Sequence, residues 1–244
     1  MGQVLSVYFG TRNRTIASLL ASALTYYFKR KYGNGASFVT FVLYLSGMLQ
    51  YRNYLINGGI VRKKTIGPLK DIVVLDLSNG ISGPGCGTIL SDLGAQTINV
   101  ESLDLPDHAR FLGSAVSTGM AGLFAHTGRG KQSIVLDLKR QDCLEAFYKL
   151  CESADVFVSN QRASVLDKLG LNPRDMHKRF PHLIICPITA YGLEGGDASR
   201  PGYDVGAFWA RSSAAWTHTR EDDQNITSGA SAFGDHATGM ASVT

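Results

Sequence analysis

The segment Asp71-Ile-Val-Val-Leu-Asp-Leu77 is a short β-branched run, and the glycine-rich stretch Asn79-Gly-Ile-Ser-Gly-Pro-Gly-Cys-Gly87 follows it directly. This order predicts a buried strand, a turn and then a helix over 88–93. The alternation recurs along the chain, with strands predicted at 96–100, 133–138, 154–158 and 183–188 and an amphipathic helix at 141–152. Short apolar strands that alternate with helices indicate a parallel sheet covered on both faces. We therefore predict an α/β fold with a doubly wound, Rossmann-like sheet, whose ligands bind beyond the carboxyl ends of the strands.

The charges divide the 244-residue chain into two parts. Residues 1–70 contain ten Lys and Arg residues and no Asp or Glu, whereas residues 71–244 contain the other fourteen basic residues and all twenty acidic ones. We accordingly treat 1–66 as a basic leader and 67–244 as the folded domain. The acidic balance of that domain argues against a nucleic-acid-binding protein, because phosphate contacts require clustered Lys and Arg on the folded surface.

The leader combines basic and apolar residues in a way that is typical of a targeting segment. Its two apolar stretches, Thr15–Phe28 and Ala36–Leu49, are both shorter than the roughly 20 residues that a membrane-spanning helix needs. We interpret the leader as a mitochondrial transit peptide. The alternatives are a marginal membrane span across 32–51, a membrane tether through the N-myristoylation pattern at Gly2, and a poorly ordered extension of a cytoplasmic protein.

Cysteine, histidine and glycine spacing argue against a metal or redox cofactor. The chain has no C-x-x-C pair and no H-x-x-x-H pair, so we predict no metal site and a reducing compartment. Gly83, Gly85 and Gly87 give the spacing G-x-G-x-G, which differs from the G-x-G-x-x-G of dinucleotide-binding folds. We therefore interpret this stretch as a tight strand-to-helix turn and expect neither a nicotinamide nor a flavin.

A series of short motifs runs through the domain. They are Gly67–Ser78 with Gly83-Pro84, Asp92–Ala95 and Val100-Glu101, then Gly128-Arg-Gly-Lys-Gln-Ser-Ile-Val-Leu-Asp-Leu-Lys139, Ala154–Asn160, Leu166–Leu171, Pro181–Gly192, Arg200–Asp204 and Gly234-Asp235. In this order they resemble the class III coenzyme A transferases, the CaiB/BaiF group. The resemblance covers nearly all of 67–244, and it implies the same α/β fold.

The family's nucleophile is an aspartate directly after a glycine, and Asp235 after Gly234 matches that position. The resemblance implies that the Asp235 carboxylate attacks the thioester of an acyl-CoA. A mixed anhydride forms and CoA thiolate leaves; the thiolate then returns and the acyl group is exchanged for that of an incoming carboxylic acid. CoA is a substrate in this scheme, and no permanently bound cofactor is required. Local sequence equally allows Asp235 to be the N-cap of a helix that we predict to begin there.

The resemblance also indicates which residues bind the substrates. Lys139 and Lys168 match positions that contact CoA, and Arg129 and Lys131 are further candidates for its phosphates. Asn160 and the turn with Ile81 and Ser82 are expected to line the same groove, while Tyr203, Asp204 and Gly234 are expected to contact the acyl substrate. For each cation the alternative is a solvated surface charge, which is the commoner fate of Lys and Arg.

Two departures from the family pattern bear on the substrate. Formyl-CoA transferases have Gln where Ile81 stands, so we expect a larger or aromatic acyl group here, lined by Ile81, Phe208 and Trp209. The related α-methylacyl-CoA racemases carry a G-H-D segment, because proton exchange at the α-carbon needs two bases. This chain has Gly202-Tyr203-Asp204, and tyrosine with a pKa of about 10 is a poor base. We therefore favour the transferase over the racemase.

The chain ends nine residues after Asp235, at Thr244. Members of the family continue into a second, smaller domain and form interlocked dimers. We interpret the chain as an incomplete transferase that is homodimeric at full length, and the alternative is a catalytically inactive CoA-binding remnant.

Overall fold

The computed structural model describes residues 60, 62–102, 106–113, 121–222, 225 and 229–244. The leader roles predicted for residues 1–59 lie outside this set. Within it, no helix is both long enough and apolar enough to cross a membrane.

Five parallel strands form one sheet in the order β3-β2-β1-β4-β5. The strands are β1 (Val73–Leu77), β2 (Gln96–Glu101), β3 (Gln132–Val135), β4 (Val156–Ser159) and β5 (Ile184–Pro187). The register pairs Val74 of β1 with both Thr97 of β2 and Val156 of β4. This strand order confirms the doubly wound, Rossmann-like sheet predicted from the sequence.

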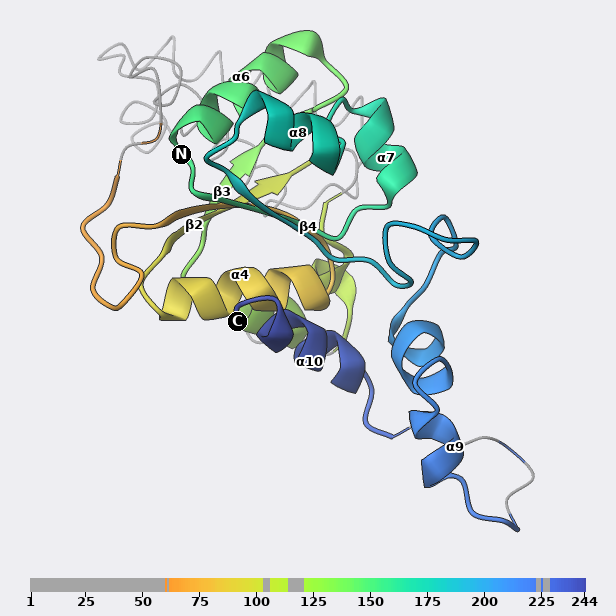
Figure 1. The fold of residues 1–244 in the computed structure, drawn as a ribbon. Coiled ribbons are helices and arrows are strands. Elements are labelled where there is room, and N and C mark those ends of the chain that lie inside the picture. Colours follow the sequence, from red (N-terminus) through yellow and green to blue (C-terminus); the bar gives the residue numbers. More distant parts are fainter. Residues whose placement is uncertain (1–59, 61, 103–105, 114–120, 223–224, 226–228) are drawn as a thin grey trace, which may run out of the picture.

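Helices cover both faces of the sheet (Figure 1). The α-helices of the described residues are α4 (Ser82–Asp92), α5 (Gly122–Thr127), α6 (Gln141–Ser153), α7 (Ala163–Lys168), α8 (Pro173–Arg179), α9 (Ala214–His218) and α10 (Phe233–Ala241). There is also a 3-10 helix, η1 (His108–Phe111), and a π-helix, η2 (Val205–Ala210). In Figure 1, α6 and α8 lie on one face, and α4 and α10 lie on the other. The elements η2 and α9 extend away from the sheet beside α10.

The alternation of side chains along β1 separates two cores. Val73 and Leu75 point into the larger core with Phe147 of α6 and Phe157 of β4. Val74 points to the opposite face, into a smaller core with residues of α4. Because successive residues of a strand face opposite sides, a continuous apolar run such as β1 is buried on both faces.

Two helix boundaries differ from the prediction. Helix α4 begins at Ser82, six residues earlier than expected, so the glycine-rich stretch is mostly helical and not a turn. Pro84 is tolerated there because the first turn of a helix has no internal acceptor for its missing N–H. Helix α10 begins at Phe233, two residues before Asp235. Its N-cap is therefore Ala232, and the N-cap alternative for Asp235 is wrong.

Candidate active site

The loops that follow β1 and β4 meet where the strand order reverses, and Asn160 joins them. Its side-chain Oδ1 accepts a hydrogen bond of 2.9 Å from the main-chain N–H of Asn79, and its Nδ2 donates one of 2.7 Å to the carbonyl of the same residue. The Nδ2 also lies 3.5 Å from the hydroxyl oxygen of Ser82. Ligands of doubly wound sheets bind beyond the strand ends at this switch point, so Asn160 lies at the expected binding position.

Helix α10 carries Asp235 to this switch point by packing closely on α4. A Cβ atom on Gly239 would lie 2.9 Å from the carbonyl oxygen of Ser82 and 3.2 Å from the main-chain nitrogen of Cys86. The two helix backbones can therefore approach only because residue 239 has no side chain. The approach brings Asp235, in the first turn of α10, next to Ser82 at the start of α4.

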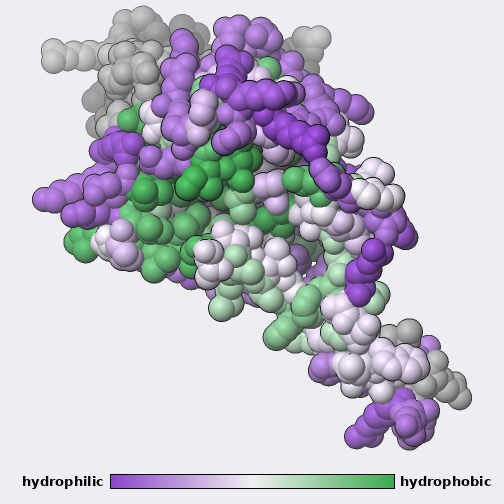
Figure 2. Space-filling model, viewed as in Figure 1, coloured by the Kyte–Doolittle hydropathy of each residue, from purple (hydrophilic) through white to green (hydrophobic). Residues whose placement is uncertain are grey.

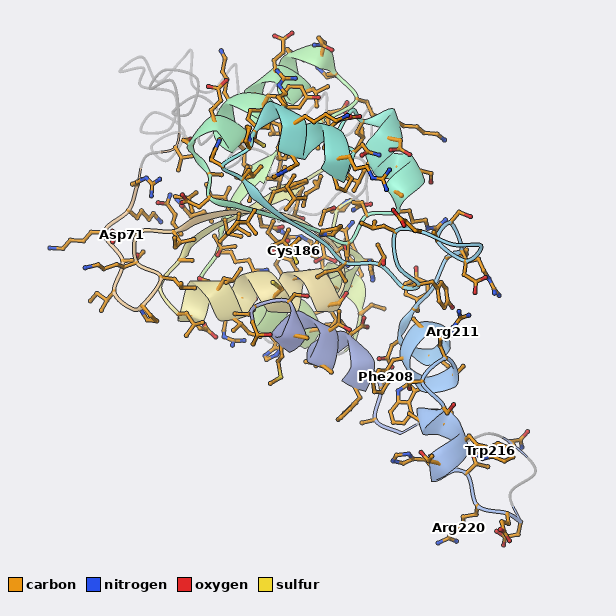
Figure 3. The ribbon with its side chains drawn as sticks, viewed as in Figure 1. Asp71, Cys186, Phe208, Arg211, Trp216 and Arg220 are labelled. Atoms are coloured by element: carbon orange, nitrogen blue, oxygen red, sulfur yellow. The ribbon has the colours of Figure 1, made fainter. Side chains whose placement is uncertain are left out.

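A second close contact fixes the start of α10 against η2. A Cβ atom on Gly234 would lie 2.3 Å from Cβ of Phe208 and 2.7 Å from Oδ1 of Asp204. The main-chain N–H of Asp235 donates a hydrogen bond of 3.0 Å to that same Oδ1. Figure 3 shows Phe208 at the end of η2 that faces α10. Gly234 thus lets Asp204 support the helix turn that holds Asp235.

The carboxylate of Asp235 lies in a mixed electrostatic environment. Burial raises its pKa above the ordinary value, and the negative charge of Asp204 raises it further. Three contacts lower the pKa of Asp235: the nearby His236, the nearby His108, and a hydrogen bond between Asp235 and the Ser82 side chain. Their effect is smaller, so the net shift of this pKa is upward. The second oxygen of Asp204 is buried and has no hydrogen-bond partner among the described residues. It is therefore an acceptor left available to a donor group.

A loop after β2, for which no site role was predicted from the sequence, contacts the turn that follows β1. Asp107 is buried, and its Oδ1 accepts hydrogen bonds from the N–H groups of Gly80, at 2.8 Å, and Ala109, at 2.9 Å. The imidazole of the next residue, His108, lies over Gly80, where a Cβ atom would be 3.0 Å from the ring. The local sequence signal is an Asp directly before a short helix, which is typical of an N-cap.

Glu101, at the end of β2, binds Arg110 of this loop. It accepts two hydrogen bonds from the guanidinium of Arg110, of 3.0 Å from Nε and 2.5 Å from Nη2. The same guanidinium stacks 3.7 Å from the ring centre of Phe124. The carboxylate of Glu101 is thereby engaged by Arg110 inside the protein.

The predicted site residues fall into two groups. Ile81, Ser82, Asn160, Asp204, Gly234 and Asp235 lie together on the contacting segments just described. Tyr203 is next to Asp204, but its side chain is exposed to solvent. Lys139 and Lys168 are exposed, and they follow β3 and end α7, respectively.

The remaining two cations do not join the site. Lys131 is buried beneath α4. Its Nζ lies 2.8 Å from Oδ2 of Asp76 and donates a hydrogen bond of 2.6 Å to the carbonyl of Pro84. The ammonium therefore already has core partners, which disfavours its role in binding CoA phosphates, and that role stays a prediction. Arg129 pairs with Asp92, the last residue of α4, so it lies at the end of that helix away from Ser82.

Comparison with known proteins gives a consistent family pattern. The sequence-family model of CoA-transferase family III matches residues 69–244. A probable fatty acyl-CoA transferase of Mycobacterium tuberculosis is 37% identical over 140 residues, which is 57% of this chain and 35% of that protein. The (R)-2-hydroxy-4-methylpentanoate CoA-transferase of Clostridioides difficile is 30% identical over 177 residues, 71% of this chain and 44% of the relative. The chain thus spans less than half of each relative.

Solved structures agree with the fold. A crystal structure of the same mycobacterial protein superposes with a TM-score of 0.65 at 31% identity, covering 73% of this chain and 49% of the other. A CAIB/BAIF family protein of Brucella suis also gives a TM-score of 0.65, at 35% identity, covering 72% of this chain and 47% of the other.

Proposed function

The chain belongs to CoA-transferase family III, and on this premise we propose that it moves coenzyme A from an acyl-CoA donor to a carboxylic acid acceptor, with Asp235 as the nucleophile. The observation that carries the proposal is the position of Asp235. Its partly buried carboxylate lies beside Ser82 at the crevice where the sheet order reverses, and Asp204 supports its backbone.

The proposed chemistry conserves the thioester energy on the enzyme. The Asp235 carboxylate attacks the thioester carbon, the C–S bond breaks, and CoA thiolate leaves behind a mixed anhydride. The thiolate then attacks the aspartyl carbonyl, so the donor acid leaves as a carboxylate and Asp235 carries CoA as a thioester. The acceptor carboxylate displaces CoA to form a second anhydride, and the thiolate attacks the acceptor's acyl carbon to give the product and free Asp235.

The surroundings of Asp235 suit this sequence of steps. Partial burial limits access of water, which would otherwise hydrolyse the anhydride. The raised pKa makes the ionised carboxylate a stronger nucleophile than a fully solvated one. The N-terminal turn of α10 lies around Asp235, and its partial positive charge favours the ionised form.

For the CoA moiety we propose Lys139, Lys168 and Asn160 as contacts. The two lysines are exposed and form no ion pair with any described residue, so their ammonium groups are available to phosphates. Asn160 already holds the β1 and β4 loops together and would keep the crevice in shape when CoA binds. Arg129 is a weaker candidate because Asp92 partly neutralises it.

For the acyl group we propose an apolar, bulky substituent. Phe208, Trp209 and Phe233 form an aromatic cluster next to Gly234, with ring centres 5.5 Å apart for Phe208 and Trp209 and 5.7 Å apart for Phe208 and Phe233. Ile81 directly precedes Ser82, the residue of α4 that contacts Asp235. A panel of acyl-CoA donors should show faster transfer from aromatic or branched acyl groups, and preference for formate or oxalate would contradict the proposal.

We also propose that the full-length protein is a homodimer. Tyr203 and Trp216 are 77% and 75% exposed on the segment that extends from the sheet, and such apolar surface is typical of an interface. Light scattering at several concentrations tests this, and a mass equal to one chain throughout would contradict it.

The mechanism is tested with an acceptor acid labelled with ¹⁸O in its carboxylate. The second anhydride shares one acceptor oxygen with Asp235, and its cleavage leaves that oxygen on the enzyme. Mass spectrometry of the peptide containing Asp235 should therefore show one ¹⁸O after turnover. Turnover without label in that peptide would overturn the anhydride route. Entry of solvent deuterium at the α-carbon of a branched acyl-CoA, without any acceptor, would instead indicate the racemase.

A further inference from the structure

A loop with a basic surface lies at the amino-terminal end of the strands, opposite the end that holds Asp235. Residues 62–71 precede β1 and fold back onto the neighbouring elements. The main-chain N–H of Lys63 donates a hydrogen bond of 2.8 Å to the side-chain oxygen of Gln96. The N–H of Leu69 donates one of 3.0 Å to the carbonyl of Leu93. The hydroxyl of Thr65 closes the loop by donating 2.7 Å to the carbonyl of Lys70. The loop is therefore anchored to β2 and to the end of α4.

A hollow of about 560 Å³ lies in this loop, and three lysines are among the residues that line it. Its lining residues are Lys63, Lys64, Thr65, Ile66, Gly67, Lys70 and Asp71. Figure 3 shows Asp71 at the end of the sheet far from Phe208, with basic side chains projecting from the surrounding loop. We call Lys63, Lys64 and Lys70, together with Ile66 and Leu93, the basic edge.

The charge of the basic edge is not neutralised locally. None of its three lysines forms an ion pair with a described residue, whereas the nearby Arg62 pairs with Asp155 at 3.6 Å. Asp71 is the one carboxylate that lines the hollow. Residues 71–244 carry fourteen basic against twenty acidic residues, so the basic edge has the sign opposite to that of the rest of the domain.

Apolar side chains are exposed among these lysines. Ile66 is 92% exposed and Leu93 is 37% exposed. They are neighbours, because a Cβ atom on Gly94 would lie 2.5 Å from the carbonyl oxygen of Ile66. Figure 2 shows hydrophilic and hydrophobic surface adjoining at this end of the molecule. Cations around an exposed aliphatic residue match a bilayer interface, where ammonium groups meet phosphates and the aliphatic group enters the acyl boundary.

We propose that the basic edge docks on an anionic lipid bilayer, with Ile66 and Leu93 entering the interface. The chain before residue 62 adds six further basic residues, no acidic ones and two apolar stretches, which favours a lipid surface over a soluble anion. Docking at this edge would leave the crevice with Asp235, at the opposite end of the strands, open to soluble substrates. The proposal does not depend on the chemistry at Asp235.

Co-sedimentation with lipid vesicles tests the proposal on the full chain. Wild-type protein should pellet with phosphatidylcholine vesicles that contain phosphatidylserine, and not with phosphatidylcholine alone. Replacing Lys63, Lys64 and Lys70 by Ala should lower the partition coefficient about 100-fold, since each lysine near an anionic surface contributes roughly 1 kcal/mol. The matched control replaces Lys149, Arg162 and Lys178, which are exposed elsewhere, and should bind vesicles like wild type.

An Ile66 variant and a heparin-binding assay distinguish lipid docking from other causes of binding. Ile66→Ser should weaken binding to the vesicles that contain phosphatidylserine severalfold, because it removes the aliphatic group that enters the interface while all three lysines remain. Equal binding of wild type and the triple lysine variant would overturn the proposal, because residues before 62 would then account for all membrane affinity. Binding to heparin without binding to vesicles would also overturn it, because the edge would then recognise soluble polyanions. Circular dichroism of each variant checks that the fold is retained.

Discussion

The main-chain N–H of Asp235 donates a hydrogen bond of 3.0 Å to Oδ1 of Asp204, and the other oxygen of that carboxylate is buried without a partner among the described residues. The nucleophile proposed for acyl transfer is therefore held by the same group whose negative charge raises its pKa. Positioning and electrostatics at this site are coupled through one side chain, and they can be separated by an isosteric substitution.

Asp204→Asn should shift the acid limb of the pH–rate profile to lower pH. In the proposed mechanism the Asp235 carboxylate is the reactive form, so activity should fall as pH drops through its raised pKa. Asn retains an oxygen that can accept from the N–H of Asp235 but removes the negative charge, which lowers that pKa. His236 and His108 act in the opposite sense to Asp204 and are unchanged in the variant. The measurement is kcat/KM against pH for both proteins, and an unmoved acid limb would show that Asp204 acts through geometry alone.

Gly239→Ala should displace α10 and reduce both stability and activity. The added Cβ would meet the carbonyl oxygen of Ser82 at 2.9 Å, and a backbone atom cannot move aside as a side chain can. We expect a loss of about 1–3 kcal/mol in the free energy of unfolding. Gly85→Ala is the matched control in α4, because nothing lies within 4 Å of its new Cβ. Alanine has the higher helix propensity, so the control should gain about 0.5–1 kcal/mol. Chemical denaturation distinguishes the two, and equal effects would contradict the close-packing account.

Lys131→Ala should destabilise the fold far more than Arg129→Ala. The Lys131 and Asp76 side chains are 3% and 0% exposed, so removal of the ammonium leaves a buried carboxylate without its partner. The expected loss is about 3–5 kcal/mol. Arg129 and Asp92 are 44% and 46% exposed, and breaking such a pair costs at most about 1 kcal/mol. Equilibrium unfolding in urea measures both variants, and similar midpoints would show that the Lys131 pair is not a buried core contact.

Cys186 should react with iodoacetamide in the native protein near neutral pH. It lies on β5 at the face towards α4 (Figure 3), and the hydrogen bond from the Cys86 thiol is the main cause that lowers its pKa to about 7. Reactivity should rise with pH through that value, because the thiolate is the nucleophile. Burial raises the pKa of Cys143, which should be alkylated only at higher pH.

Cys86→Ala is the informative variant for this thiol. It removes the main hydrogen bond to Cys186, so the midpoint of Cys186 alkylation should rise towards the ordinary cysteine value of about 8.5. Peptide mass spectrometry follows each cysteine separately. Labelling of Cys186 no faster than that of Cys143 at neutral pH would refute the lowered pKa.

Much of the architecture could be predicted from local sequence. The alternation of short apolar runs with amphipathic segments located all five strands and α6, and the strand order followed the rule for doubly wound sheets. The start of α4 could not be predicted, because Gly83, Pro84 and Gly85 have poor helix propensity. That first turn packs against α10, a contact between residues about 150 positions apart, and such tertiary packing can override a poor helix propensity.

The sequence by itself identified the family motifs and the pairing of Gly234 with Asp235, because these depend only on residue type and order. Tertiary structure alone decided which charges are available to a ligand. Lys131 and Lys139 lie eight residues apart in one motif, yet the first is sealed beneath α4 against Asp76 and the second is exposed. Asp107 gained its role from the N–H of Gly80, which only the fold brings near. The physical reason is that desolvation and pairing depend on neighbours in space, and a linear pattern does not specify them.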